Sequence, residues 1–177
     1  MATPEHPEGA LAHGNIADEL ARGQKNLEVV VVSPARSIFE GDAHWVTVPA
    51  WDRVGGSRGP KLYGPPEPGQ LIVGQLGIWP GHAPIVAALG SGLLRVGLGG
   101  GRIARFAVRG GFLKVGGSKV TILVDSAVAE ADANQAEAQH ELDETLAALR
   151  HPRTDQEFEE LLDRRAWSET RIKLARK

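Results

Sequence analysis

Glycine stops at Gly117, and this uneven distribution restricts the possible folds of the chain more than any other feature of its sequence. Between Leu27 and Gly117, glycine-rich turns separate short runs of apolar or alternating residues, a pattern typical of antiparallel strands. From about Ala129 the composition changes to Ala, Glu, Gln, Asp, Leu and Arg, which is typical of helices. The chain has 177 residues, enough for one sizeable core and a second small unit. We therefore expect a mainly β unit followed by an α-helical unit.

The first unit is expected to be an antiparallel β-sandwich or flattened barrel spanning residues 27–129. Two pairs of runs flank glycine turns and predict hairpins. These pairs are residues 92–98 with 102–108, and residues 112–115 with 119–124. The run from Leu27 to Ser33 is rich in consecutive valines, so we expect it to be buried on both faces. Further strands are expected at residues 38–40 and 44–48, separated by Gly41 and Asp42.

The second unit, residues 130–177, is expected to form an antiparallel hairpin of two helices. Asp132 is the candidate N-cap of the first helix. Leu142, Leu146 and Leu149 recur at the spacing that lines one face of that helix. His151-Pro152 should end it, because proline cannot continue the helical hydrogen bonds.

Thr154 should begin the second helix, with Glu157 three residues later to complete a capping box. Its expected apolar side consists of Phe158, Leu161, Leu162 and Ile172. From Glu130 onward the chain carries 12 acidic and 8 basic residues. Such a high density of charge is typical of a solvent-exposed face. A pair of helices held to the rest of the protein by few contacts is also typical of a movable arm.

Two segments lack the pattern of either unit. Residues 1–26 are rich in Pro, Glu, Gly, Ala and His, and we interpret them as a mobile tail. Residues 51–71 contain Gly55-Gly56, Gly64-Pro65-Pro66 and Pro68-Gly69, and we interpret them as an irregular loop with Tyr63 as a possible anchor.

Composition argues against several classes of function. The formal net charge is −2, which does not favour a nucleic-acid partner. The chain has no cysteine, and its apolar runs are far shorter than the ~20 residues of a membrane-spanning helix. Its six histidines are scattered without the spacing of metal ligands. No motif of a nucleophile with a paired base is present either, so we expect no catalytic residue and no metal site.

One loop, Gly74 to Pro84, combines three glycines, two prolines and a histidine between apolar strands. Glycine and proline together specify a rigid, exposed turn, and such loops usually contact a partner or ligand. His82 is interpreted as a hydrogen-bonding loop residue, because no nucleophile accompanies it. The alternative is that the loop is a packing corner of the sandwich, and Ile78 and Trp79 are core candidates in either case.

Several segments, in this order, resemble the epsilon subunit of bacterial F-type ATP synthases. The resemblance runs from Leu27 to the C-terminus. Its strongest parts are residues 27–34 with 38–41, the loop 74–84, the segment Ala107-Val108-Arg109-Gly110-Gly111-Phe112-Leu113-Lys114-Val115, and residues 120–125. Family members usually have only a few residues where this chain has residues 51–71, so we interpret that segment as an insertion.

The resemblance implies a non-catalytic rotor subunit of the central stalk that couples proton translocation to ATP synthesis. The implied partners are the gamma subunit and the membrane-embedded c-ring, and transiently the alpha and beta subunits of the catalytic head. The protein would then lie on the cytoplasmic face of the bacterial cell membrane, reaching the membrane only through the complex. The implied partner contacts are Gly74, Gln75, Leu76, Gly77, Pro80, Gly81 and His82. The insertion precedes this loop, so it either enlarges the contact or is a dispensable surface loop.

The helical pair resembles the regulatory arm of the family, which can block ATP hydrolysis in several bacteria. Its candidate inhibitory residues are Arg164, Arg165, Arg171 and Lys173. Some relatives bind ATP there through an Asp-x-x-Arg-Ala motif, and the matching positions here run from Asp132 to Ala136. Gln135 replaces the arginine, which removes a cation suited to phosphate, so we expect no cofactor and weak or absent ATP binding.

A function of a different class remains open at this point. A small β-sandwich enzyme or carbohydrate-binding module with a helical appendage would also fit the expected architecture. Such a site should gather polar or aromatic side chains on one sheet face. The predicted strands offer mainly Val, Leu, Ile and Gly, which favours the rotor subunit.

Overall fold

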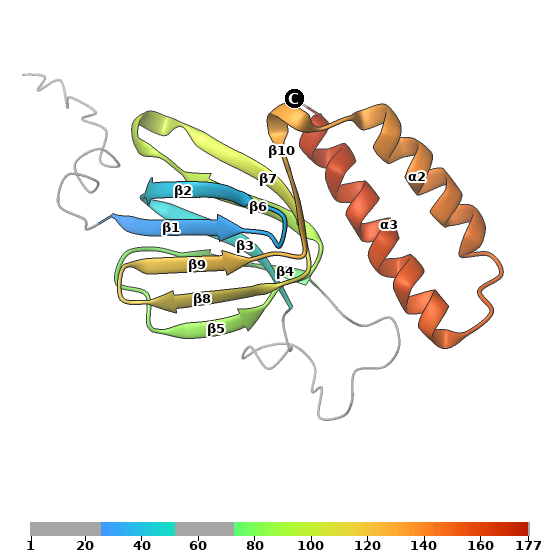
Figure 1. The fold of residues 1–177 in the computed structure, drawn as a ribbon, viewed down its shortest axis with the longest axis horizontal. Helices are drawn as coiled ribbons and strands as arrows, with labels where there is room; N and C mark the ends of the chain where they lie inside the picture. Colours follow the sequence, from blue (N-terminus) through green and yellow to red (C-terminus); the bar gives the residue numbers. More distant parts are fainter. Residues whose placement is uncertain (1–25, 52–72, 177) are drawn as a thin grey trace, which may run out of the picture.

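The computed structural model describes residues 26–51 and 73–176. Within these ranges ten strands form two five-stranded sheets, and two α-helices follow them (Figure 1). The predicted tail 1–26 and loop 51–71 lie almost wholly outside the described residues. The prediction of a β-sandwich followed by a two-helix hairpin is confirmed.

The first sheet has the strand order β2-β1-β9-β8-β5. The pairing is antiparallel throughout except between β1 and β9, which run parallel. A salt bridge joins this parallel pair, in which Lys119 Nζ lies 2.9 Å from Glu28 Oε1 and the carboxylate raises the pKa of Lys119. The strands are β1 (Leu27–Val32), β2 (Ser37–Ala43), β5 (Ile85–Ala88), β8 (Phe112–Gly116) and β9 (Lys119–Leu123).

The second sheet has the strand order β10-β7-β6-β3-β4 and is antiparallel. Its edge strand β4 pairs with β3 from Val46↔Ile78 to Trp51↔Val73. The strands are β3 (Trp45–Trp51), β4 (Val73–Ile78), β6 (Gly92–Gly97), β7 (Ile103–Arg109) and β10 (Ser126–Ala129). Both hairpins predicted around glycine turns are present as β6–β7 and β8–β9.

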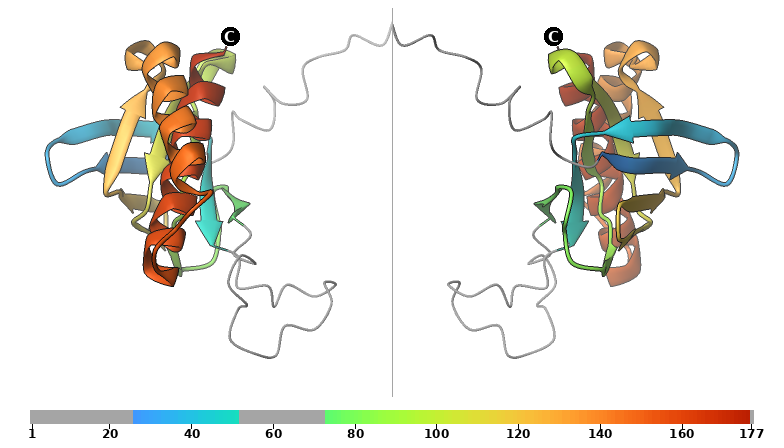
Figure 2. Two further views of the ribbon diagram at one scale, coloured as in Figure 1. Left: turned by 90° about the vertical axis from the view of Figure 1, so that its right-hand side faces the viewer. Right: turned by 90° about the vertical axis from the view of Figure 1, so that its left-hand side faces the viewer.

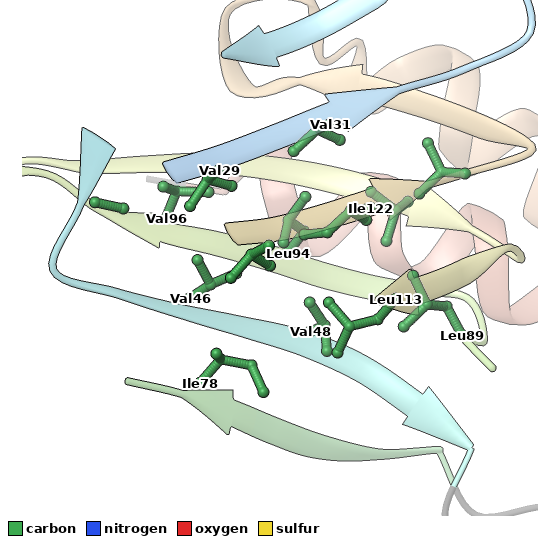
Figure 3. Packing of buried hydrophobic residues seen from close by; sticks show 14 of the residues in the cluster. Val29, Val31, Val46, Val48, Ile78, Leu89, Leu94, Val96, Leu113 and Ile122 are labelled. Atoms are coloured by element: carbon green, nitrogen blue, oxygen red, sulfur yellow. The ribbon is translucent and has the colours of Figure 1, made fainter. Parts of the chain in front are cut away.

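The core lies between the two sheets (Figure 3). Successive residues of a strand point to opposite faces, so every second side chain enters this layer. Aliphatic side chains fill it, and Phe39 and Phe106 meet there edge to face with ring centroids 6.1 Å apart. The central, fully buried residues include Val29, Val31, Val46, Val48, Leu94, Val96, Leu113 and Ile122.

Two helices complete the described chain, after a short 3₁₀ turn η2 (Glu130–Asp132). These are α2 (Gln135–Ala148) and α3 (Asp155–Ala175). Helix α3 packs against β6 and β7 on the outer face of the second sheet, and α2 packs against α3 (Figures 1 and 2). Neither helix is long and apolar enough to cross a membrane.

Two strand predictions were wrong in detail. In β1 only Leu27, Val29 and Val31 are fully buried, and the intervening residues face outward. The outward valines still favour the strand, because β-branched side chains pack well on a pleated, half-buried surface. The expected break at Gly41-Asp42 lies inside β2, where Gly41 pairs with Val29, and the chain turns instead at His44.

The helical predictions also need two corrections. Helix α2 is capped by Asn134, whose side chain accepts a hydrogen bond from Glu137 N at 3.2 Å, whereas Asp132 lies in η2. The fully buried residues of α2 are Ala138 and Thr145, while Leu146 is 40% exposed. Leu142 and Leu149 are only half-buried, so the leucine spacing did not identify the most buried residues of α2.

Candidate functional site

The predicted contact loop was only partly correct: residues 74–78 belong to the edge strand β4, and only the residues after Ile78 form a turn. In the turn, His82 N donates a hydrogen bond to the Trp79 carbonyl oxygen at 3.0 Å. Gly81 adopts a φ of 84°, a conformation that favours glycine. His82 Nδ1 lies 2.8 Å from the Ala83 carbonyl oxygen, so its ring is engaged with the loop backbone. The sequence pattern thus specifies a local turn held by its own hydrogen bonds.

The residues predicted to contact partners divide by exposure. Gln75 and Gly81 are exposed, while Gly74, Gly77, Pro80 and His82 are half-buried. Leu76 packs against the edge of the core, so its side chain contributes more to the sandwich than to an outer surface. Of the two core candidates, Ile78 is fully buried but Trp79 is 52% exposed. The prediction for Trp79 was wrong, because it follows the last residue of β4 and its ring lies outside the sandwich.

Two tryptophans lie across glycines of the second sheet. A side chain at Gly77 would overlap the ring of Trp79, and a side chain at Gly97 would overlap the ring of Trp45. Gly97 is the register partner of Trp45. The glycines are therefore required for the two rings to lie against the strands, a role that sequence spacing alone did not reveal.

A polar bridge lies on the same sheet. Arg95 Nη1 donates to Gln75 Oε1 at 3.2 Å, which links β6 to β4 across β3. Thr47 pairs in register with both Arg95 and Gly77, and its hydroxyl is buried without a partner among the described residues. We define the outer strip as Trp45, Thr47, Gln75, Trp79 and Arg95. Tryptophan and arginine are the residues enriched at the energetic centres of protein interfaces.

The four predicted arm residues have different environments. Arg165 pairs with Glu169 within α3 at 2.8 Å, and Lys173 is exposed. Arg164 reaches Glu141 and Glu144 of α2 at 3.4 and 3.7 Å. Arg171 is the most enclosed of the four, so in this conformation it faces the helical hairpin and not an outside partner.

Arg171 joins the two helices. Its Nη2 lies 2.7 Å from Glu137 Oε1 and its Nη1 lies 2.6 Å from Glu141 Oε2. Its guanidinium group also lies 5.9 Å from the ring centre of Trp167, a favourable cation–π contact. These contacts hold the arginine between two carboxylates and one aromatic ring.

The helical hairpin meets the sandwich through α3. Asp163 Oδ2 accepts a bond from Arg109 Nε at 2.7 Å, and its Oδ1 accepts one from the Ser91 hydroxyl at 2.9 Å. No sequence pattern predicted the contact between Ser91 and Asp163. The apolar part of the contact is a small cluster of Trp167, Leu174, Ala107, Leu93, Val128 and Ala133.

The degenerate nucleotide motif lies on the surface. Asp132 and Gln135 are both exposed, in η2 and at the start of α2. Asp132 Oδ2 lies 3.9 Å from Arg36 Nη2, between two well-exposed side chains. Across residues 26–51 and 73–176, no three His, Cys, Asp or Glu side chains are grouped as a metal site would require.

A β-sandwich followed by a helical hairpin is a class of fold that includes a subunit of ATP synthase. Residues 70–130 match the family model described as the β-sandwich domain of the ATP synthase delta/epsilon chain. A chain in the cryo-EM structure of Euglena gracilis mitochondrial ATP synthase, OSCP/F1/c-ring in rotational state 1, is similar with a TM-score of 0.64. The similarity covers 94% of this chain and 88% of that one, at 18% identity, and therefore concerns the fold alone.

Similarity to individual proteins defines the family more narrowly. The ATP synthase epsilon chain of Synechococcus sp. is 34% identical over 123 residues, covering 70% of this chain and 74% of that protein. The ATP synthase epsilon chain of Neisseria meningitidis serogroup C / serotype 2a is 31% identical over 135 residues, covering 76% and 81%. The chain belongs to the family of ATP synthase epsilon chains. This relationship favours the rotor subunit over the carbohydrate-binding module or enzyme considered from sequence.

Proposed function

We propose that this chain is a rotor subunit of the central stalk of an F-type ATP synthase, without a catalytic site of its own. It couples proton translocation through the membrane ring to ATP synthesis in the catalytic head. The observation that carries this proposal is the similarity to epsilon chains, which covers 70% and 76% of this chain in two of them. The protein is then a peripheral component on the cytoplasmic face of the membrane.

The proposed partners are the gamma subunit and the c-ring. The proposed contact is formed by residues 74–82, which comprise most of β4 and the turn after it, together with the outer strip. A contact that transmits torque needs a surface of fixed shape. The turn at Gly81 and the bridge between Arg95 and Gln75 support such a surface, and a stiff loop loses little entropy when it docks. Gln75 and His82 contribute polar groups beside the exposed Trp79.

Affinity purification of the tagged chain from its native cells tests the function. Recovery of gamma, the c-ring and the catalytic subunits supports the proposal, and a chain recovered without them contradicts it. Trp79→Ala and Arg95→Glu should reduce the recovered gamma and c-ring several-fold, because aromatic and arginine contacts dominate interface energies. Leu146→Ala, which truncates an exposed apolar residue on α2, is the matched control and should leave recovery unchanged.

We further propose that the helical hairpin restrains ATP hydrolysis, with Arg164, Arg165 and Lys173 meeting acidic surfaces of the catalytic head. Charge complementarity of this kind favours association and orientation. Removal of residues 130–177 from the assembled complex should raise its rate of ATP hydrolysis. An unchanged rate would exclude an inhibitory role.

Weak or absent ATP binding is proposed for the hairpin. Gln135 offers no cation to a phosphate, and Arg171 is already held by Glu137 and Glu141. Binding of ATP there would require breaking two short charged hydrogen bonds. Calorimetric titration of the full chain should show no micromolar binding, and saturable binding in that range would overturn the proposal.

A further inference from the structure

The edge strands of the sandwich differ in how they are protected from pairing with other chains. They are β2 and β5 in the first sheet and β4 and β10 in the second. An edge strand exposes backbone N–H and C=O groups, and proteins protect it by charge, by short length or by a bulge. Strand β2 carries Glu40 and Asp42, and its register with β1 shifts between Val31 and Val32. Strands β5 and β10 have only four residues each.

Strand β4 has none of these protections. It has six residues, from Val73 to Ile78, without a charged side chain or a proline. Its register with β3 runs unbroken from one end of the strand to the other. Within residues 26–51 and 73–176, β4 pairs with β3 alone. It is therefore the edge best suited to accept a further strand.

The pairing with β3 determines which backbone groups of β4 point outward. Opposite residues of an antiparallel pair either exchange hydrogen bonds or direct their groups away from each other, and the two kinds alternate. On β3, the carbonyl oxygen of Pro49 accepts a hydrogen bond from Gly90 N at 3.0 Å, on the side away from β4. Its register partner Gln75 therefore directs its N–H and C=O groups away from β3. Gly77, two residues later, does the same.

These two residues make the β4 edge complementary to itself. When a second copy of the chain approaches antiparallel, with a two-fold axis at Leu76, Gln75 lies opposite Gly77 of that copy and Gly77 lies opposite its Gln75. Every outward N–H of these residues then meets a C=O. The exposed ring of Trp79, which lies over Gly77, comes beside Gln75 of the second copy. Such an interface uses the same surface on both copies, as two-fold dimers do.

We infer that free copies of this chain associate through their β4 edges, with Gln75 and Gly77 of one copy paired to Gly77 and Gln75 of the other. The pairing covers part of the surface proposed for gamma and the c-ring, residues 74–82. A copy is therefore either paired with a second copy or incorporated into the stalk. This competition rests on the proposed function, whereas the pairing itself does not.

Sedimentation equilibrium of the purified full chain tests the pairing. The mass should rise with concentration from 18.9 kDa toward twice that value. A mass that stays at 18.9 kDa up to about 1 mM, the weak end of specific affinities, would overturn the inference.

Two substitutions at Gln75 then distinguish backbone pairing from side-chain contact. Gln75→Pro removes the outward N–H and leaves the bonds to β3 in place, because an edge strand tolerates proline where its N–H faces outward. It should weaken association about tenfold or more, since each copy loses a donor. Gln75→Ala is the matched control: it keeps the N–H, loses the bond to Arg95 and should associate like the natural chain. Equal weakening by both variants would exclude pairing through the backbone.

Hydrogen exchange of the natural chain, resolved by residue, needs no variant that has to fold. The amides of Gln75 and Gly77 should exchange rapidly in dilute solution and slowly in concentrated solution. The amides of Leu76 and Ile78, which face β3, should be slow in both. Slow exchange of Gln75 and Gly77 in a monomer would show that the chain covers this edge itself, and would overturn the inference.

Addition of the purified gamma subunit tests the competition. Paired copies should separate as gamma binds, leaving complexes with one copy each. Gamma bound to copies that stay paired would contradict the competition. Paired copies that do not bind gamma would count against the proposed function and leave the pairing supported.

Discussion

Side chains on neighbouring positions of one strand pair have opposite environments in the sandwich. Leu113 of β8 is fully buried, and Leu123 of β9 is 51% exposed, although its neighbour Ile122 pairs with Leu113 in register. Leucine should therefore contribute differently to stability at these two positions, because successive residues of a strand point to opposite faces of the sheet.

Leu113→Ala should lower the free energy of unfolding by about 2–5 kcal/mol, because it leaves a cavity between the sheets. Leu123→Ala is the matched control and should cost less than about 1 kcal/mol. Urea denaturation of the two variants measures both values. Similar losses would contradict the assignment of inner and outer faces.

Gly81→Ala should destabilise the turn by about 1–2 kcal/mol, because a φ of 84° forces a side chain into the left-handed region even though there is free space around it. Gly116→Ala is the control, since Gly116 also has free space but no positive φ. Its change in unfolding free energy should stay within about 0.5 kcal/mol. Equal effects at the two sites would show that the turn conformation carries no cost.

In the candidate site, only those features that depend on residues close together in the sequence could be predicted. The turn at Gly81 follows from glycine and proline spacing, and the structure contains this turn and the predicted hydrogen bonding of His82. The outer position of Trp79 depends on where β4 ends. The bond between Ser91 and Asp163 joins residues 72 positions apart, and no sequence pattern indicates it.

At the scale of elements, helix caps and glycine turns determined which helices and strands could be predicted from the sequence. Thr154 accepts a hydrogen bond from Glu157 N at 3.1 Å, as the capping box predicts. The Glu157 carboxylate accepts from Arg153 N at 2.7 Å, one residue earlier than expected. The glycine turns identified β6–β7 and β8–β9. Strand β4 was missed because its residues were assigned to the loop 74–84, and the four-residue strands β5 and β10 were not predicted either.

Thr154→Ala should destabilise the first turn of α3 by about 1 kcal/mol, because Glu157 N loses its acceptor. Hydrogen exchange of the amides at residues 155–157 should accelerate accordingly. Thr154→Ser keeps the hydroxyl and should exchange like the natural chain. If alanine and serine behave alike, the cap contributes nothing to this helix.

At the scale of the whole molecule, a large apolar cluster lies within the sandwich, and a smaller one joins the sandwich to the helical hairpin. The large cluster between the sheets draws its buried residues from positions before 130. The smaller cluster joins Trp167 and Leu174 to Ala107. The sandwich therefore contains the groups needed for a core without the helices.

A chain ending at Ala129 should still unfold cooperatively, with the helical signal lost and a stability reduced by about 1–3 kcal/mol through exposure of Ala107, Leu93 and Val128. Circular dichroism during thermal unfolding measures both changes. A truncated chain without a cooperative transition would show that the helices are part of the same folding unit.

The parallel pairing of β1 with β9 has a consequence for biosynthesis. Strand β1 can form a hairpin with β2 as soon as both have left the ribosome, but its other edge waits for Lys119–Leu123, which is translated about 90 residues later. During that interval one edge of β1 lacks its partner strand and the first sheet stays incomplete. Nascent chains of this protein should therefore depend on chaperones until β9 is released, and the completion of the first sheet should limit the rate of folding.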